Sequence, residues 1–123
     1  MILIHELSHV YSPGTVFEKK ALDHVDLKIE DGEILGIIGH TGSGKSTLIQ
    51  HLNGLLKPTE GAVYFNGEDI HDKDFSMKKL RSKIGLVFQY PEHQLFESTV
   101  IEDVQFGPKN MGLDPLEMEM RSF

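Results

Sequence analysis

The sequence contains no cysteine among its 123 residues, so disulfide bonds are excluded and a cytosolic setting is expected. No apolar stretch approaches the ~20 residues that a helix needs to span a bilayer, which argues against a membrane span. Basic residues are few, and 12 of them against 19 acidic residues give a net charge of −7. Because binding to nucleic-acid phosphates needs a basic face, this balance argues against such a partner. The first residues, 1–6, lack the basic segment and small-residue cleavage site of a secretory signal.

The length fits about one small domain, and the hydrophobic content of 39% is compatible with a globular core. Seven histidines are present, but they form no H-x-x-x-H pair on a predicted helix and have no cysteine partners. The sequence therefore predicts scattered surface histidines and no metal site built from them.

The most informative stretch is residues 39–47, G-H-T-G-S-G-K-S-T, which fits the phosphate-binding pattern G-x-x-x-x-G-K-S/T at every fixed position. This pattern is the P-loop, or Walker A motif, and it is meaningful only between a strand and a helix. Residues 34–38 are continuously apolar, as in a strand buried on both faces, and residues 45–53 carry apolar side chains at helical spacing. Gly54 and Pro58 favour the end of that helix.

The residue types of this motif suit a triphosphate. Gly42 and Gly44 allow the backbone to turn its N–H groups inward, and the first-turn N–H groups of the helix have no partner within it. We expect Lys45 to reach the β- and γ-phosphates, the Ser46 hydroxyl to bind Mg²⁺, and Thr47 to face the α-phosphate. A glycine-rich turn that binds nothing would have no packing reason for a lysine and a hydroxyl at these offsets. The predicted binding residues are Gly39, His40, Thr41, Gly42, Ser43, Gly44, Lys45, Ser46 and Thr47.

Strands and helices alternate along the rest of the chain, which predicts an α/β fold. Two strands, residues 2–10 and 21–29, precede the P-loop strand and indicate an added antiparallel layer. The sequence then predicts a strand at 62–65 with a turn at 66–67, a solvated helix at 75–83 and a buried strand at 84–88. Two further helices are predicted after these. The first is opened by a capping box at Thr99 and Glu102 and ended by Gly107-Pro108, and the second starts at Asp114-Pro115.

Together these motifs resemble the nucleotide-binding subunits of ABC transporters. The resemblance rests first on residues 39–47 and on Val87-Phe88-Gln89, which stand where that family has its P-loop and its Q-loop. It rests also on the segment between these two motifs, where residues 61–63 read G-A-V and residues 66–67 read N-G. Residues 11–18, 89–96 and 106–110 are similar to the ATP-binding subunits of energy-coupling factor (ECF) transporters, which take up vitamins and metal ions in bacteria. The stretches at 13–15 and 110–112 resemble the second of the two ATPase types.

The resemblance implies roles for two residues outside the P-loop. Tyr11 corresponds to the aromatic A-loop residue that stacks on adenine, a contact worth about 1 kcal/mol, and the alternative is a tyrosine that only packs on its neighbours. Gln89 corresponds to the Q-loop glutamine, whose side-chain oxygen reaches Mg²⁺ or the attacking water. The implied catalytic residues are therefore Lys45 and Gln89, the metal ligands Ser46 and Gln89, and the cofactors ATP and Mg²⁺.

The resemblance also implies a peripheral protein on the cytoplasmic face of the cell membrane, which couples ATP binding and hydrolysis to uptake of a vitamin or metal ion. Its partners would be a second ATP-binding subunit, a transmembrane coupling subunit and a substrate-binding membrane subunit, with no nucleic acid. Residues 89–108 mix aromatic side chains with a proline-containing loop, so we expect them to contribute to the surface that docks the membrane partner.

Nothing in the sequence matches the family's L-S-G-G-Q signature, its apolar strand ending in Asp-Glu, or its switch histidine. We therefore expect the N-terminal part of an ABC ATPase: an antiparallel part with the A-loop at 1–33, the P-loop core to the Q-loop at 34–89, and the start of the helical subdomain at 90–123. No residue is assigned as the general base. Two alternatives stay open: a nucleotide-binding module without catalysis, and another P-loop kinase, which would need neither Gln89 nor Tyr11.

Overall fold

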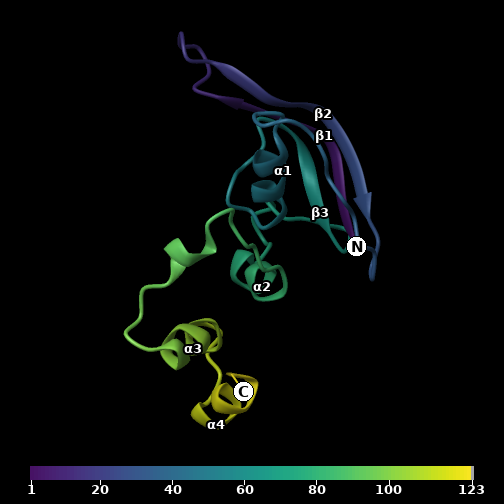
Figure 1. Cartoon of the computed structure of the whole chain (residues 1–123). Coiled ribbons are helices and arrows are strands. Elements are labelled where there is room, and N and C mark those ends of the chain that lie inside the picture. The colour runs from purple at the N-terminus through teal and green to yellow at the C-terminus, as the bar shows by residue number, and fades with distance from the viewer. Residues whose placement is uncertain (123) are drawn as a thin grey trace. The chain divides into compact units, whose positions relative to one another are not determined.

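The computed structural model describes residues 1–122, which form two compact units, Met1–Leu86 and a second that begins at Val87. The first unit contains a four-stranded antiparallel sheet in the order β2-β1-β3-β4 (Figure 1). Its strands are β1 (Ile2–Tyr11), β2 (Lys19–Ile29), β3 (Glu60–Phe65) and the short β4 (Glu68–Asp69). The predicted antiparallel layer is confirmed.

A bulge explains why the alternation of apolar residues in β1 is imperfect. The pairing of β1 with both neighbours shifts register after residues 4 and 5, and Glu6 adopts a positive φ of 45°. One extra residue in a strand moves the following side chains to the other face. As a result Ile4 and Leu7, three positions apart, are both buried in the core.

The helices of the first unit cover one face of this sheet. α1 (Lys45–Leu52) packs Leu48 into the core, and α2 (Met77–Lys83) packs Leu80 into it (Figure 1). The basic side chains of α2 are exposed, which confirms the predicted solvated helix. The buried apolar residues are Ile4, Leu7, Leu22, Leu48, Val63, Ile70 and Leu80.

Two predicted strands are wrong. Residues 34–38 and 84–88 take no part in any sheet of the described chain. Ile34 and Ile38 are 99% and 96% exposed, and Val87 and Phe88 are exposed as well. A strand exists only through hydrogen bonds to a neighbouring strand, and neither segment pairs with any of the four strands of the sheet. The apolar sequence of both segments predicts full burial, but among these residues only Ile84 and Leu86 are even partly buried.

The second unit contains the 3₁₀ turn η1 (Pro91–Gln94), α3 (Val100–Asn110) and α4 (Pro115–Ser122). The capping box at the start of α3 is confirmed, because Thr99 Oγ1 accepts from the Glu102 amide and Glu102 Oε2 accepts from the Thr99 amide. The predicted stop at Gly107-Pro108 is wrong, because α3 continues to Asn110. Gly107 has no Cβ to meet the proline ring, and the helix ends instead before Gly112, whose φ is +78°.

The start of α4 is also confirmed, because Asp114 Oδ1 accepts a hydrogen bond of 2.9 Å from the Glu117 amide. The predicted helix reaches Phe123, which lies outside the described residues. Neither α3 nor α4 contains a buried residue, so local hydrogen bonds and surface contacts hold this unit. Over residues 1–122, no helix is long and apolar enough to span a membrane.

We predict that the 123-residue chain expressed alone associates with itself. The apolar segment at 34–38 exposes the side chains of Ile34 and Ile38, and its backbone is not paired with any strand of the sheet. An exposed apolar segment of this kind pairs readily with another chain. Light scattering after size exclusion should show oligomers or aggregate, and the double variant Ile34→Lys, Ile38→Lys should shift the population toward monomer. A sharp monomer peak for the unchanged chain would contradict this expectation.

Candidate nucleotide-binding site

The glycine-rich loop at 39–44 leads directly into α1, as the sequence predicts. Gly44 is the N-cap of α1, with φ 100° and ψ 6°, a left-handed conformation that favours glycine. A Cβ at this position would lie 2.6 Å from the Ala21 carbonyl oxygen of β2. Gly44 is therefore required both by its backbone conformation and by the close approach of β2. Gly42 also has a positive φ of 82°, but a Cβ there would meet nothing within 4 Å.

The Lys45 side chain folds back over the loop that precedes it. Its ammonium donates to the carbonyl oxygens of Gly39 and His40, at 2.5 and 2.8 Å, and to Ser43 Oγ at 3.2 Å. These contacts place the positive charge at the centre of the loop, within reach of any anion bound there. The Ser43 amide donates to the His40 carbonyl at 3.2 Å, which closes a tight turn inside the same loop.

The first turn of α1 presents backbone donors beside this charge. The first hydrogen bond of the helical ladder runs from the Leu48 amide to the Gly44 carbonyl, at 2.9 Å. The amides of Lys45, Ser46 and Thr47 therefore lie ahead of the ladder, where the helix dipole favours negative charge. With an exposed serine hydroxyl at 46, these groups fit a phosphate and its metal ion: amide and ammonium donors for the anion and a hydroxyl oxygen for a hard cation.

Tyr11 lies beside the same helix. It is the last residue of β1, it is 39% exposed, and its hydroxyl is 3.1 Å from Thr47 Oγ1. The structure thus brings together the predicted aromatic residue and the last residue of the P-loop motif, although they are 36 positions apart in sequence.

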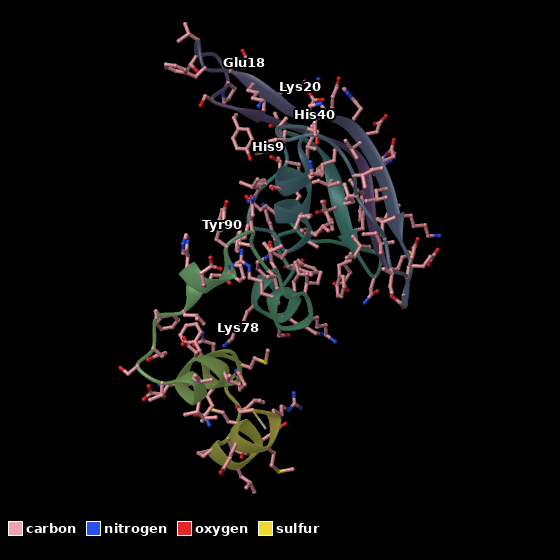
Figure 2. All side chains as sticks on the ribbon, in the orientation of Figure 1. His9, Glu18, Lys20, His40, Lys78 and Tyr90 are labelled. Carbon is pink, nitrogen blue, oxygen red and sulfur yellow. The ribbon has the colours of Figure 1, made fainter. Side chains whose placement is uncertain are left out.

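The expectation that all histidines are scattered on the surface is wrong. His51, on α1, is fully buried, and its ring contacts His9 of β1 at a centroid distance of 4.8 Å. His9 in turn contacts the Tyr11 ring at 4.6 Å, and both contacts are edge-to-face. His9, labelled in Figure 2, therefore links β1 to α1, and its ring also contacts that of Tyr11. The sequence could have indicated the contact between His9 and Tyr11, because residues two positions apart lie on the same face of a strand. It could not have indicated His51 as the partner on α1.

The hydrogen bonds of these two histidines define their tautomers. A backbone carbonyl only accepts, so His51 donates from Nδ1 to the Thr47 carbonyl at 2.7 Å, and His9 donates from Nδ1 to the Lys57 carbonyl at 3.2 Å. Among the described residues, the buried Nε2 of His51 has no hydrogen-bond partner. Burial lowers the pKa of His51, and the neighbouring imidazoles of His9 and His71 lower it further. His51 is therefore held neutral.

Gln89, the other predicted catalytic residue, is exposed and belongs to the second compact unit. It follows the apolar segment at 84–88 and precedes η1, as the sequence predicts for a loop residue. The neighbouring Tyr90 ring stacks on His93 at 5.7 Å.

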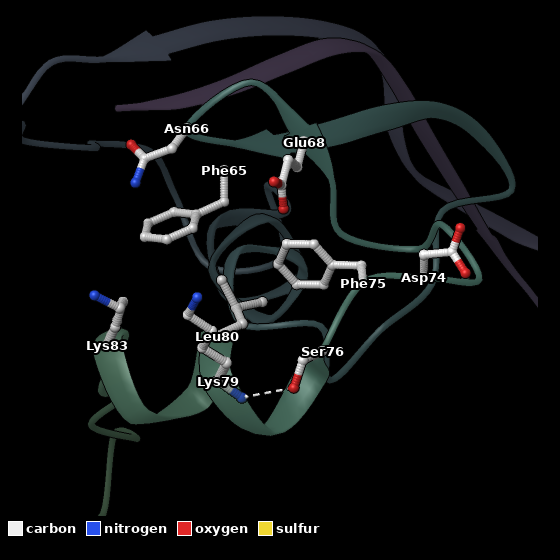
Figure 3. Close-up of a pocket in the computed structure, with 9 residues that line it drawn as sticks. All are labelled: Phe65, Asn66, Glu68, Asp74, Phe75, Ser76, Lys79, Leu80 and Lys83. Atoms are coloured by element: carbon white, nitrogen blue, oxygen red, sulfur yellow. Dashed lines mark hydrogen bonds between the residues drawn. The ribbon is translucent and has the colours of Figure 1, made fainter.

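A cavity of about 310 Å³ in the first unit lies apart from the P-loop (Figure 3). Two phenylalanine rings and two lysines of α2 line it, and none of residues 39–47 does. Its lining residues are Phe65, Asn66, Glu68, Asp74, Phe75, Ser76, Lys79, Leu80 and Lys83. The candidate site is thus an exposed loop and helix end, and it does not coincide with this cavity.

The loop pattern at 39–46, the helix that it opens and the lysine ammonium held over the loop are features of P-loop proteins, although residues 34–38 form no strand before the loop in the described structure. The family model for ABC transporters matches residues 22–122. The chain therefore belongs to the ABC transporter family.

Curated relatives confirm the resemblance to the second type of ECF ATPase. The chain is 58% identical, over 120 residues, to the energy-coupling factor transporter ATP-binding protein EcfA2 of Clostridium acetobutylicum, and 59% identical to that of Symbiobacterium thermophilum. Each match covers 98% of this chain and 42% of the relative. The chain thus spans less than half the length of the relatives it matches.

Solved structures confirm the ABC ATPase fold. cbiO1 of Clostridium perfringens, described as part of the ABC transporter complex cbiONQ, matches with a TM-score of 0.77 and 42% identity, over 98% of this chain and 46% of that one. The ATP-binding cassette MJ0796, solved as a dimer bound to ADP and Pi, matches with a TM-score of 0.79 and 30% identity, over 99% and 54% of the two chains.

We predict that Gly44→Ala destabilises the protein more than Gly42→Ala does. Both substitutions force a left-handed alanine, which costs about 1–2 kcal/mol, but only the Gly44 variant also drives a Cβ into the Ala21 carbonyl. We expect an additional loss of about 1–3 kcal/mol in the free energy of unfolding for Gly44→Ala. Urea unfolding of the protein at its natural length measures both variants, and equal losses would show that β2 does not constrain the loop.

We also predict that acid destabilises the protein through His51. Its folded-state pKa lies below the value of about 6.5 for an unfolded histidine, so the unfolded state binds the proton more tightly. The contribution of the neutral His51 to the free energy of unfolding is therefore fully present above about pH 6.5, and it is lost as the pH falls through the folded-state pKa. Unfolding midpoints between pH 8 and pH 5 should fall less steeply in His51→Leu than in the wild type. The exposed His93→Leu is the surface control, and identical slopes for wild type and His51→Leu would contradict the assignment.

Proposed function

We propose that the chain is the N-terminal part of an ATP-binding subunit of an ECF-type ABC transporter, which couples ATP binding and hydrolysis to uptake of a vitamin or metal ion. The observation that carries this proposal is the Lys45 ammonium at the centre of the P-loop, next to the amides that open α1. An ammonium and converging amides match the β- and γ-phosphates of a nucleoside triphosphate. The close relation to ECF ATPases supports the narrower assignment.

The remaining roles that we propose rest on position for Tyr11, Ser46 and Thr47, and on the family resemblance alone for Gln89, which belongs to the second unit. Thr47 faces the α-phosphate, and the half-exposed ring of Tyr11 offers adenine a stacking surface next to Thr47. Mg²⁺ would be held by the Ser46 hydroxyl and the Gln89 side-chain oxygen, and it would neutralise charge between the β- and γ-phosphates. The loop residues Gly39 to Ser43 contribute backbone rather than side chains, because their positions are exposed and turn-forming.

The partners we propose are a second ATP-binding subunit, a transmembrane coupling subunit and a substrate-binding membrane subunit, and the location is the cytoplasmic face of the cell membrane. The second unit supports a docking role, because Tyr90, Leu95 and Phe96 are all more than half exposed. Phe96 contacts Phe106 edge-to-face at 4.8 Å, which keeps an apolar pair at the surface. Exposed apolar clusters of this kind mark interaction sites.

A nucleotide-binding module without catalysis is the second candidate. It is favoured by the same P-loop geometry together with the lack of an L-S-G-G-Q signature or a second acidic motif in these 123 residues. The genomic DNA that follows the codon for residue 123 separates the two candidates. An in-frame signature and an apolar strand ending in Asp-Glu support the transport ATPase, and their absence supports the binding module.

We predict that Lys45→Ala weakens binding of ATP·Mg²⁺ by about 10- to 100-fold, since a charge-assisted hydrogen bond contributes roughly 1.5–3 kcal/mol. Isothermal titration calorimetry of the protein at its natural length measures the loss. Lys79→Ala is the matched control, because Lys79 is an exposed lysine that lines the cavity remote from the P-loop, and it should bind as the wild type does. Unchanged affinity in Lys45→Ala would overturn the P-loop assignment.

A further inference from the structure

Four residues form a closed circuit of contacts between β1 and α1, through three side chains and both the hydroxyl and the backbone carbonyl of Thr47. The ring of Tyr11 contacts His9, His9 contacts His51, His51 donates to the Thr47 carbonyl, and Thr47 Oγ1 lies 3.1 Å from the Tyr11 hydroxyl. All four belong to the first compact unit. The circuit therefore joins the aromatic residue at the end of β1 to the last residue of the P-loop motif by two separate routes.

Tyr11 needs this support because little else restrains its ring. It is the last residue of β1, its partner in the ladder is the exposed Lys19, and residues 12–18 that follow it are all exposed. The hydroxyl contact with Thr47 restrains the tip of the side chain only. The edge-to-face contact with His9, at 4.6 Å and an interplanar angle of 78°, is the contact that restrains the plane of the ring.

His9 is itself held in place on two sides. Its Nδ1 donates to the Lys57 carbonyl, and its ring meets the fully buried His51 at an interplanar angle of 72°. A ring backed by a buried side chain and tied by a hydrogen bond has few other rotamers open to it. His9 is thus a rigid support against which the more exposed Tyr11 packs.

Burial, with a smaller effect of the neighbouring imidazoles, lowers the pKa of His51 and keeps its ring neutral. His51 is faced by His9 from β1, by His71 from the segment after β4, and by the Lys57 backbone from the loop after α1. His71 is in turn faced by the Lys57 ammonium and the Asp69 carboxylate. Among residues 1–122, no group of three or more His, Cys, Asp or Glu side chains is arranged to hold a metal ion. The contacts that His9 and His51 make are ring contacts and hydrogen bonds to backbone carbonyls.

We propose that His9 is a positioning residue for Tyr11, and that the ring contact between them sets the plane on which a nucleotide base stacks. The proposal rests on the function proposed above, because it requires Tyr11 to contact the base. The loop at 39–44 is held by contacts of Lys45 and Gly44 that do not involve His9, which reaches the motif only through Thr47 at its far end. His9 therefore affects recognition of the base and leaves recognition of the triphosphate unchanged.

A pair of substitutions separates the two contacts that His9 makes. His9→Phe keeps the ring beside Tyr11 and His51 but cannot donate to Lys57, whereas His9→Gln keeps a donor and loses the ring. Binding of ATP·Mg²⁺ and of inorganic triphosphate·Mg²⁺ is measured for both variants, and for Tyr11→Ala, in the protein at its natural length. We expect His9→Gln and Tyr11→Ala to bind ATP about two- to tenfold more weakly with triphosphate binding unchanged, and His9→Phe to bind both ligands as the wild type does.

Several results would overturn the proposal. Equal losses for both ligands in His9→Gln would make His9 a purely structural residue, and normal ATP binding in His9→Gln with a loss in His9→Phe would assign the role to the Lys57 hydrogen bond. Unchanged ATP binding in Tyr11→Ala would show that Tyr11 does not stack on the base, and His9 would then have no stacking residue to position. Failure of the proposed function is a distinct outcome, because Lys45→Ala would then leave triphosphate binding intact. Retained triphosphate binding in each His9 variant shows that the variant is folded.

Discussion

The close approach between β2 and the start of α1 is the constraint on which the candidate site depends. Gly44 touches the Ala21 carbonyl so closely that no side chain fits between them, and the left-handed backbone of Gly44 turns the chain into the helix at that point. Because Leu22, next along β2, is buried in the same core as Leu48 of α1, sheet and helix are locked together there. The direction of the helix start, and with it the set of free amides, follows from this one contact.

The same packing explains how two distant parts of the sequence meet. With α1 held against the sheet, the end of β1 lies beside the helix, so that Tyr11 reaches Thr47 and His9 reaches His51. The core that holds these elements consists of seven buried apolar residues, all from the first compact unit. The second unit has no buried residue in either α-helix and relies on its capping box and on carboxylate caps such as Asp103, which accepts from the amides of Phe96 and Glu97.

Local rules predicted the local features well. The motif at 39–47 and the capping box at Thr99 both follow from short stretches whose physics is contained within a few residues. The predictions of strands at 34–38 and 84–88 were wrong because an apolar run indicates only a preference for burial in a sheet. A strand also requires a partner strand, which the apolar run itself does not specify. His51 was missed for a related reason: it is a polar residue on α1 that is covered by His9, which lies far from it in the sequence, and no periodicity in the sequence signals this contact.

The contacts of Lys45 limit how strongly a triphosphate can be held. The ammonium already donates to two carbonyl oxygens and a serine hydroxyl, so a phosphate must compete with three existing hydrogen bonds. The net gain is the difference between charge-assisted bonds to phosphate and bonds to neutral acceptors, which differ in strength by a factor of roughly two. A lysine suits this exchange, because its ammonium rotates on a flexible stem and can turn from the carbonyls of Gly39 and His40 to an anion without moving the loop. The loop itself stays anchored at Gly44, so the rearrangement that binding requires is confined to one side chain.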